Sequence, residues 1–394
     1  GLGDVYKRQV MELTKCKLGE LITQRREKND GSDLPICGVS KDGLIPPKQK
    51  DADTSIYNVF YRDDFIFNPA RMELNSIAIN DMYDRAICSS LYEVFYVHRT
   101  DLLLPHYLEL IIRQKWFTRY CKFLGQGSAR EYCRFGNISE IEIEFPPIEE
   151  QQKIVEYNTA IENRIALKQK INDNLVAVGT ASIQKNVGRG ALINLTEAEM
   201  DSLIFPEDFK IKTVSEFCAE TKSGSTPSRT NNEYWENGTI SWVKSGEVHN
   251  NITLQTEEYI TSLGLSESST KLLPKDTVLM AMYGVTAGEV GYLAIEATTN
   301  QAICGMICRS KAEAAYLYFS LIQSQAAISR LSNGGAQDNL SKSFIDNIKI
   351  VVPPSEFIEK LNLAAIVEQM TLNTKEITLL EELQATVLAQ LSSR

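Results

Sequence analysis

The chain has 394 residues, of which 43% are apolar, and it carries a formal net charge of −10. This length accommodates two ordinary domains with additional helices, and the composition is that of a globular protein. No apolar run approaches a membrane span, and the eight cysteines are scattered without paired spacing. These totals exclude a membrane-spanning protein and a disulfide scaffold, and they favour a reducing, cytoplasmic setting.

The first part of the chain predicts a mixed domain of short strands and helices. Residues 1–9 fit no pattern, and 1–14 are left unassigned, with Met11 as the candidate natural start. A helical signal covers 18–22, and β-branched and aromatic residues predict strands at 36–39, 56–60, 65–67, 76–79 and 92–97. Helical spacing of apolar residues then predicts one helix from Pro105 to beyond Tyr120, and a glycine-rich loop at 125–130 follows.

The outer face of this predicted helix is basic. The segment from Arg113 to Arg134 contains six basic side chains and one acidic side chain. A local concentration of positive charge, rather than the net charge, sets the field near a phosphate backbone, and glycine-rich loops let backbone N–H groups approach phosphates. The segment therefore predicts phosphate contacts, with a solvated helix face and a plain helix-to-strand turn as the alternatives.

A strand-to-helix junction occurs twice. Alternating runs at 141–145 and 348–352 end at Pro146-Pro147 and Pro353-Pro354, respectively. Proline cannot donate to a sheet ladder but suits a first helical turn, so each junction predicts a long helix. The two junctions are 207 residues apart (353 − 146), and upstream residues such as Gly127 and Gly334 recur at the same offset. This period is too long for a solenoid and predicts two related domains, each followed by a long helix.

Both long helices carry an apolar seam. In the first helix, 148–187, the seam consists of Ile154, Ile161, Ile165 and Leu175, with Lys168 filling one place of the seven-residue register. In the C-terminal helix, 353–394, it includes Leu372, Leu379, Leu383 and Val387. Such seams predict a coiled-coil-like pair, and the duplicated layout makes that pair antiparallel with pseudo-two-fold symmetry.

The second unit, 206–352, repeats the plan of the first, 15–147, after a linker at 188–205. Helical signals cover 214–218 and 312–331, and strands are predicted at 240–243, 277–282, 288–295 and 302–308. A second glycine-rich loop lies at 333–337. The fold class is therefore α+β, with two similar domains separated by two long helices.

Catalytic and cofactor motifs are missing from the sequence. There is no Walker A loop and no G-x-G-x-x-G loop, and Cys304 and Cys308 lack the further ligands of a zinc site. The three histidines, His98, His106 and His249, are isolated and form no nucleophile–base set. Asn68-Pro69-Ala70 lacks the second proline and the aromatic of the amino-methyltransferase motif, so a turn is the better interpretation.

With both units considered, the chain resembles the specificity subunits of type I restriction–modification systems from Lys15 onward. The first half shows the marks Gly127-Ser128-Ala129-Arg130 and 146–154, from Pro-Pro-Ile-Glu-Glu to Lys-Ile. The second half shows Gly224-Ser225-Thr226-Pro227-Ser228, Glu233-Tyr234-Trp235, Trp242-Val243-Lys244 and Asn300-Gln301-Ala302. The second junction departs from the pattern, with Phe357-Ile358 where the first has Gln151-Gln152.

The resemblance implies a non-catalytic, DNA-binding subunit in which each domain recognises one half of a bipartite target. It also implies methyltransferase and translocase–nuclease partners, which use S-adenosylmethionine, ATP and Mg²⁺, and no cofactor or membrane contact of this chain. The candidate DNA-binding residues are Arg113, Lys115, Arg119, Lys122, Gly127, Ser128, Arg130, Lys222, Thr226, Arg229, Lys244, Gly335, Gln337 and Lys342. The candidate subunit-docking residues are the eight helix seam residues named above.

Two other interpretations remain open from sequence. One is the recognition region of a single-chain enzyme that fuses methyltransferase and nuclease, which would need upstream cofactor loops. The other is a duplicated helical adaptor without a DNA role, which would not bind long duplex DNA even with its methyltransferase.

Overall fold

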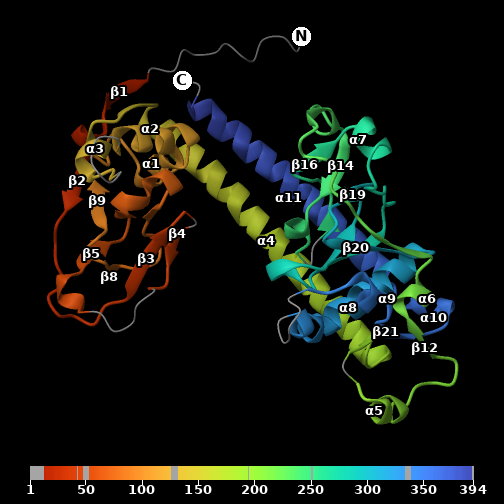
Figure 1. The fold of residues 1–394 in the computed structure, drawn as a ribbon. Coiled ribbons are helices and arrows are strands. Elements are labelled where there is room, and N and C mark those ends of the chain that lie inside the picture. Colours follow the sequence, from red (N-terminus) through yellow and green to blue (C-terminus); the bar gives the residue numbers. More distant parts are fainter. Residues whose placement is uncertain are drawn as a thin grey trace, which may run out of the picture. The chain divides into compact units, whose positions relative to one another are not determined.

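The computed structural model describes residues 13–41, 43–47, 53–125, 132–193, 195–249, 252–332 and 339–392 (Figure 1). The chain divides into two compact units, one formed by 1–164 with 380–394 and the other by 165–379. Gly127, Ser128, Arg130, Gly335 and Gln337 lie outside the described residues.

The described residues of the first unit form three small sheets. A two-stranded sheet pairs β1 with β10, and two four-stranded sheets have the orders β2-β9-β6-β7 and β4-β3-β8-β5. The strand bounds are β1 Thr14–Lys17, β2 Ile22–Arg25, β3 Ile36–Ser40, β4 Gly43–Ile45, β5 Asn58–Tyr61, β6 Phe65–Phe67, β7 Ile77–Ile79, β8 Arg85–Cys88, β9 Glu93–Val97 and β10 Glu142–Phe145. Stacked Phe65 and Phe95 lie in the core, which α1 (Pro105–Ile112), α2 (Lys115–Gly125) and α3 (Phe135–Ser139) complete.

Two helix predictions in this unit are wrong. The stretch at 18–22 is a single 3-10 turn, Leu18–Glu20, and Ile22 already belongs to β2, which pairs with β9. The helix from Pro105 breaks after Ile112, where the Arg113 N–H bonds the carbonyls of Glu109 and Ile111. The break changes the direction of the chain, so that Phe117 of α2 packs in the same core as the buried side chains of α1.

In the second unit the part of the chain that the structure describes likewise forms three sheets, with a long covering helix. The strand orders are β13-β20-β17-β18-β15, β16-β14-β19 and β11-β21-β12. Their bounds are β11 Ala191–Leu192, β12 Lys210–Thr213, β13 Glu220–Ser223, β14 Ile240–Val243, β15 Ile252–Thr253, β16 Glu258–Ile260, β17 Thr277–Ala281, β18 Val290–Leu293, β19 Thr298–Thr299, β20 Ile303–Ile307 and β21 Lys349–Val352. Helix α8 (Lys311–Ser332) buries Tyr316, Tyr318 and Phe319 in the core of this unit, and the shorter helices are α5 Glu197–Asp201, α6 Val214–Phe217, α7 Ser262–Ser266 and α9 Lys342–Asp346.

The predicted duplication is visible in the two junctions. In the first unit β1 pairs antiparallel with β10, and in the second β12 pairs antiparallel with β21. Both β10 and β21 lead through Pro-Pro into a helix. The segment predicted as a linker is not free of structure, because β11 within it pairs with β21 and α5 follows.

The two long helices pack antiparallel, as predicted. In the second unit Lys168 of α4 (Ile148–Asn186) lies 2.8 Å from Glu376 of α11 (Leu363–Ser392), and Asn172 bonds Asn373. In the first unit the Gln384 amide donates to Asn158. Residue numbers therefore rise along α4 as they fall along α11. The predicted single C-terminal helix is interrupted, since α10 (Ser355–Lys360) ends before Asn362, which adopts φ 53°.

The seam of α11 is not where the leucine pattern predicted it. The buried side chains are Leu363, Val367, Met370 and Asn373, whereas Leu372, Leu379 and Leu383 are 56%, 56% and 50% exposed. The prediction that these leucines occupy the interhelical seam is wrong, because they lie beside it. Ile154, Ile161, Ile165, Leu175 and Val387 are partly buried. Polar side chains also take part in the seam, since Asn158, Asn172 and Asn373 are buried in it.

Candidate nucleic-acid interface

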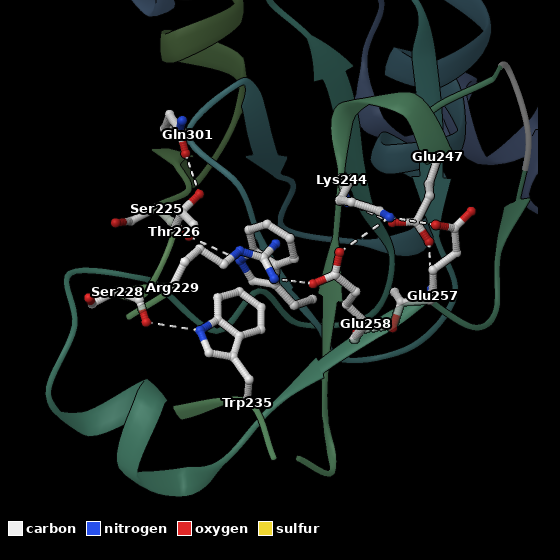
Figure 2. A network of polar contacts seen from close by, with 12 residues as sticks. Ser225, Thr226, Ser228, Arg229, Trp235, Lys244, Glu247, Glu257, Glu258 and Gln301 are labelled. Carbon is white, nitrogen blue, oxygen red and sulfur yellow. Dashed lines mark hydrogen bonds and ion pairs between the residues drawn. The ribbon is translucent and has the colours of Figure 1, made fainter. Parts of the chain in front are cut away.

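The loop that follows β13 is held tightly against the second unit. A Cβ at Gly224 would lie 2.1 Å from Thr299 Oγ1, so only glycine allows this close approach. The Ser225 N–H donates to the Thr299 carbonyl at 2.9 Å, and the Thr226 hydroxyl donates to Gln301. The predicted site residue Thr226 is therefore fixed by its neighbours (Figure 2).

Arg229, in the same loop, lies between two tryptophans. Its guanidinium carbon is 3.7 Å from the Trp235 ring centroid and 4.8 Å from that of Trp242, and the two rings are at 89° to each other. Both indole N–H groups donate to loop carbonyls at 3.0 Å, Trp235 to Ser228 and Trp242 to Ser225. These contacts orient the arginine, whose side chain remains 50% exposed (Figure 2).

The carboxylates of Glu257 and Glu258, at the start of β16, lie against Arg229 and Lys244. Trp242 of β14 lies directly opposite Glu258 of β16, which puts the Glu258 carboxylate against Arg229. Lys244 Nζ pairs with Glu257 and lies 3.3 Å from Glu258. The hydrogen bond from Arg229, with help from Lys244, holds the pKa of Glu258 below its ordinary value, and the bond to Glu257 raises the pKa of Lys244.

Glu247 has a different role in this cluster. Its carboxylate accepts from the backbone N–H of Lys244 at 2.7 Å and from that of Glu257 at 2.9 Å. It thus ties together the two strand ends from which the charged side chains project.

The other predicted residues of the second unit lie in a separate network. Lys342 donates to Thr221 and pairs with Asp346, both at 2.6 Å, and Thr221 in turn donates to Asp346. Lys222 pairs with Glu220 at 2.9 Å. The structure therefore brings together Thr226, Arg229 and Lys244, but not Lys222 and Lys342.

In the first unit, α2 presents the predicted basic face. Lys115, Arg119 and Lys122 are exposed, and within the described part of the chain none of them forms an ion pair. Arg113, at the end of α1, differs because it donates to the Lys41 carbonyl at 2.6 Å and pairs with Glu109. Three cations on α2 are thus available to an anionic partner.

An aromatic cage around an arginine also exists in the first unit. Arg25 lies 4.7 Å from the Tyr61 ring and 4.6 Å from the Tyr96 ring, and it bonds both oxygens of Asp64. The Asp64 side chain is only 2% exposed and also accepts from the Tyr61 N–H. The Arg25 side chain is 24% exposed, but its carboxylate partner is buried and held by both the guanidinium and the backbone, which favours a structural role for the pair.

Sequence reasoning did not assign the partners in these clusters to the site: it named Trp235 and Trp242 only as marks of the resemblance and did not name Glu257 or Glu258. The signal was present for Trp235 and Trp242, which lie close in sequence to Arg229 and Lys244. Glu258 could not be found this way because strand pairing alone brings it there.

No metal-binding group of three or more His, Cys, Asp or Glu side chains occurs among the described residues. Burial raises the pKa of the Cys304 thiol to about 12, which keeps it protonated and unsuited to ligate zinc. No described helix is long and apolar enough to cross a membrane.

Duplicated α+β domains, each followed by a long helix, and exposed cations in each unit are the arrangement expected of a nucleic-acid recognition protein. The family model for the type I restriction modification DNA specificity domain matches residues 4–177 and again 206–385. The chain belongs to this family and is the non-catalytic DNA specificity subunit of a type I restriction–modification system, with two target-recognition domains.

Individual relatives agree with this assignment. The chain is 22% identical to the HindI specificity subunit of Haemophilus influenzae over 74% of this chain and 77% of that protein. It is 26% identical to the EcoR124I/EcoR124II specificity subunit of Escherichia coli over 50% of this chain and 46% of that protein. The crystal structure of a type I S subunit from M. genitalium has a similar fold, with a TM-score of 0.58, 14% identity and 98% coverage of both chains.

Proposed function

We propose that the first domain recognises one half of a bipartite duplex target and the second domain the other half. The observation that carries this proposal is that the specificity-domain model matches the chain twice. Each domain also presents exposed cations, on α2 in the first unit and at Arg229 and Lys244 in the second. Such groups supply the phosphate contacts that orient a protein on DNA before bases are recognised.

The long helices are proposed to dock methyltransferase subunits, and the assembled complex to recruit a translocase–nuclease subunit. The exposed side chains that support docking are Leu372 and Leu379 in the second unit and Leu383 in the first. On α4, Tyr157, Leu167 and Val178 are also more than half exposed. Apolar side chains recurring along one helix favour a protein partner over solvent.

The chemistry of the complex is assigned to these partners. We propose that S-adenosylmethionine, ATP and Mg²⁺ bind there, and that the complex works in the cytoplasm. This chain supplies positioning only, so purified alone it neither methylates nor cleaves DNA. Methylation by the purified chain, free of any methyltransferase subunit, would contradict this assignment.

The test of the proposed function is methylation mapping. The chain is co-expressed with its methyltransferase in a host without background modification, and methylated bases are mapped over the genome. The expected result is one bipartite motif that appears only when both proteins are present. The same motif in cells that lack this chain would refute the proposal.

A further inference from the structure

Two cations of the second domain converge on one carboxylate. Arg229 Nη1 bonds one oxygen of Glu258, and Lys244 Nζ lies 3.3 Å from the other oxygen (Figure 2). A carboxylate held by a guanidinium and an ammonium has the same charge as a DNA phosphate and, like it, presents two acceptor oxygens side by side. The pair of cations is therefore already arranged for an anion of this kind.

Contacts fix the positions of both cations, but their side chains remain accessible to solvent. Arg229 is stacked on Trp235 and Trp242, and the backbone of Lys244 is fixed by Glu247. Their side chains are nevertheless 50% and 32% exposed, and that of Glu258 is 31% exposed. The Arg25–Asp64 pair shows the contrast, since its carboxylate is 2% exposed and bonds the arginine through both oxygens. The Glu258 carboxylate is therefore open to exchange with an outside anion, whereas the Asp64 carboxylate is not, although the Arg25 side chain is 24% exposed.

We propose that Arg229 and Lys244 form a DNA phosphate-binding site of the second domain, which Glu258 occupies in the free protein and a phosphate takes over in the complex. This inference rests on the proposed function, because it requires the domain to bind duplex DNA. Glu258 then acts as a specificity-determining residue that makes no contact with a base. A phosphate must displace it, and this exchange is favourable only where the other contacts of the correct sequence also form.

The exchange has a measurable electrostatic signature. A cation that engages a phosphate contributes about 0.9 to the slope of log K against log salt. A displaced Glu258 carboxylate attracts counterions from solution, which lowers the net number of counterions released when DNA binds. Without the negative charge at 258, Arg229 loses its ion pair and Lys244 keeps only the one with Glu257, so binding to any duplex becomes tighter and more dependent on salt.

The test uses the full chain in complex with its methyltransferase and measures affinity for a target duplex and an unrelated duplex from low to moderate salt. Glu258→Gln keeps an acceptor for Arg229 but removes the charge. We expect it to bind the unrelated duplex about fivefold more tightly, with a steeper salt slope and a smaller ratio of specific to non-specific affinity. Arg229→Gln is expected to weaken binding to both duplexes and to reduce the slope by about one.

Two further variants separate the site from a general charge effect. Glu267→Gln removes one negative charge from the same domain, and Glu267 bonds Tyr234 rather than either cation. It should leave the affinity ratio unchanged. In the Arg229→Gln background, Glu258→Gln should lose most of its gain, because the two residues act on the same phosphate.

Each outcome bears on a separate claim. If wild-type complex shows no preference for the target duplex, the proposed function fails. If that preference is present but Glu258→Gln leaves non-specific affinity unchanged or weakens it, this inference alone is overturned. A changed methylation motif in Arg229→Gln would also overturn it, since that result assigns Arg229 to a base.

Discussion

Gly179, near the C-terminal end of α4 but still within the helix, gives a test in which two physical effects have opposite signs. Alanine normally stabilises a helix interior by about 1 kcal/mol relative to glycine. A Cβ at this position, however, would lie 2.3, 2.4 and 2.6 Å from three ring carbons of Phe319 in α8. Carbon atoms in contact are normally about 3.5–4.0 Å apart, so the ring must move by about 1 Å.

The overlap is expected to win. Phe319 is fully buried and packs against Tyr318 at a centroid distance of 5.0 Å, so it has no free space to enter. Overpacking of this kind costs about 1–3 kcal/mol. Gly179→Ala should therefore destabilise the second unit by up to about 2 kcal/mol net, which corresponds to a melting temperature up to roughly 8 °C lower.

The assay is thermal and urea denaturation of the full chain. Gly136→Ala is the matched control, because Gly136 lies in the short helix α3 and a Cβ there meets nothing within 4 Å. It should be neutral or stabilising. Phe319→Leu should relieve the overlap, so the double variant should lose less stability than the two single changes added together. A higher melting temperature for Gly179→Ala would refute the packing argument.

Four further outcomes are expected. Leu372→Asp, at an exposed position, should abolish association with the methyltransferase and leave the chain's melting temperature unchanged. Met370→Asp, at a buried position, should instead unfold the second unit. Gel filtration with the methyltransferase and melting curves of the chain check both outcomes. Arg119→Ala should weaken binding to all duplexes alike and lower the salt slope by about one, and an altered motif would contradict a phosphate contact. Because the pKa of Glu258 is lowered, its ion pairs contribute fully above the ordinary glutamate pKa and are lost as pH falls through the lower folded value; tryptophan fluorescence should show this acid transition in the wild type and not in Glu258→Gln. One heptad inserted in both long helices adds about 10 Å and should lengthen the gap of the target by up to about three base pairs with both half-sites unchanged, which methylation mapping checks.

Features that repeat in the sequence, or that show a strong apolar period, could be predicted from the sequence alone. The Pro-Pro junctions, the helix from Ile148 and the duplication were all predicted, because proline punctuation and apolar spacing are local signals. Breaks in helices were not predicted. The turn after Ile112 and the left-handed Asn362 are decided by how the next segment reaches the core, which no local pattern contains.

The seam of α11 shows a second limit. Leucines at 372 and 379 are seven residues apart and look like a coiled-coil stripe, but the structure buries Met370 and Asn373 instead. The buried partner across the seam is Asn172, so polar pairing defines the register and the leucines remain outside. An apolar pattern alone cannot distinguish a helix's internal partner from an external one.

The most direct test of the central claim is to exchange one domain and map the methylation. Residues 206–352 are replaced by the corresponding domain of another specificity subunit, the hybrid is co-expressed with the methyltransferase, and methylated bases are mapped. The account predicts that one half of the bipartite motif changes while the other half stays the same. A folded, active hybrid that kept the complete original motif, or that changed both halves, would contradict the assignment of one half-site to each domain.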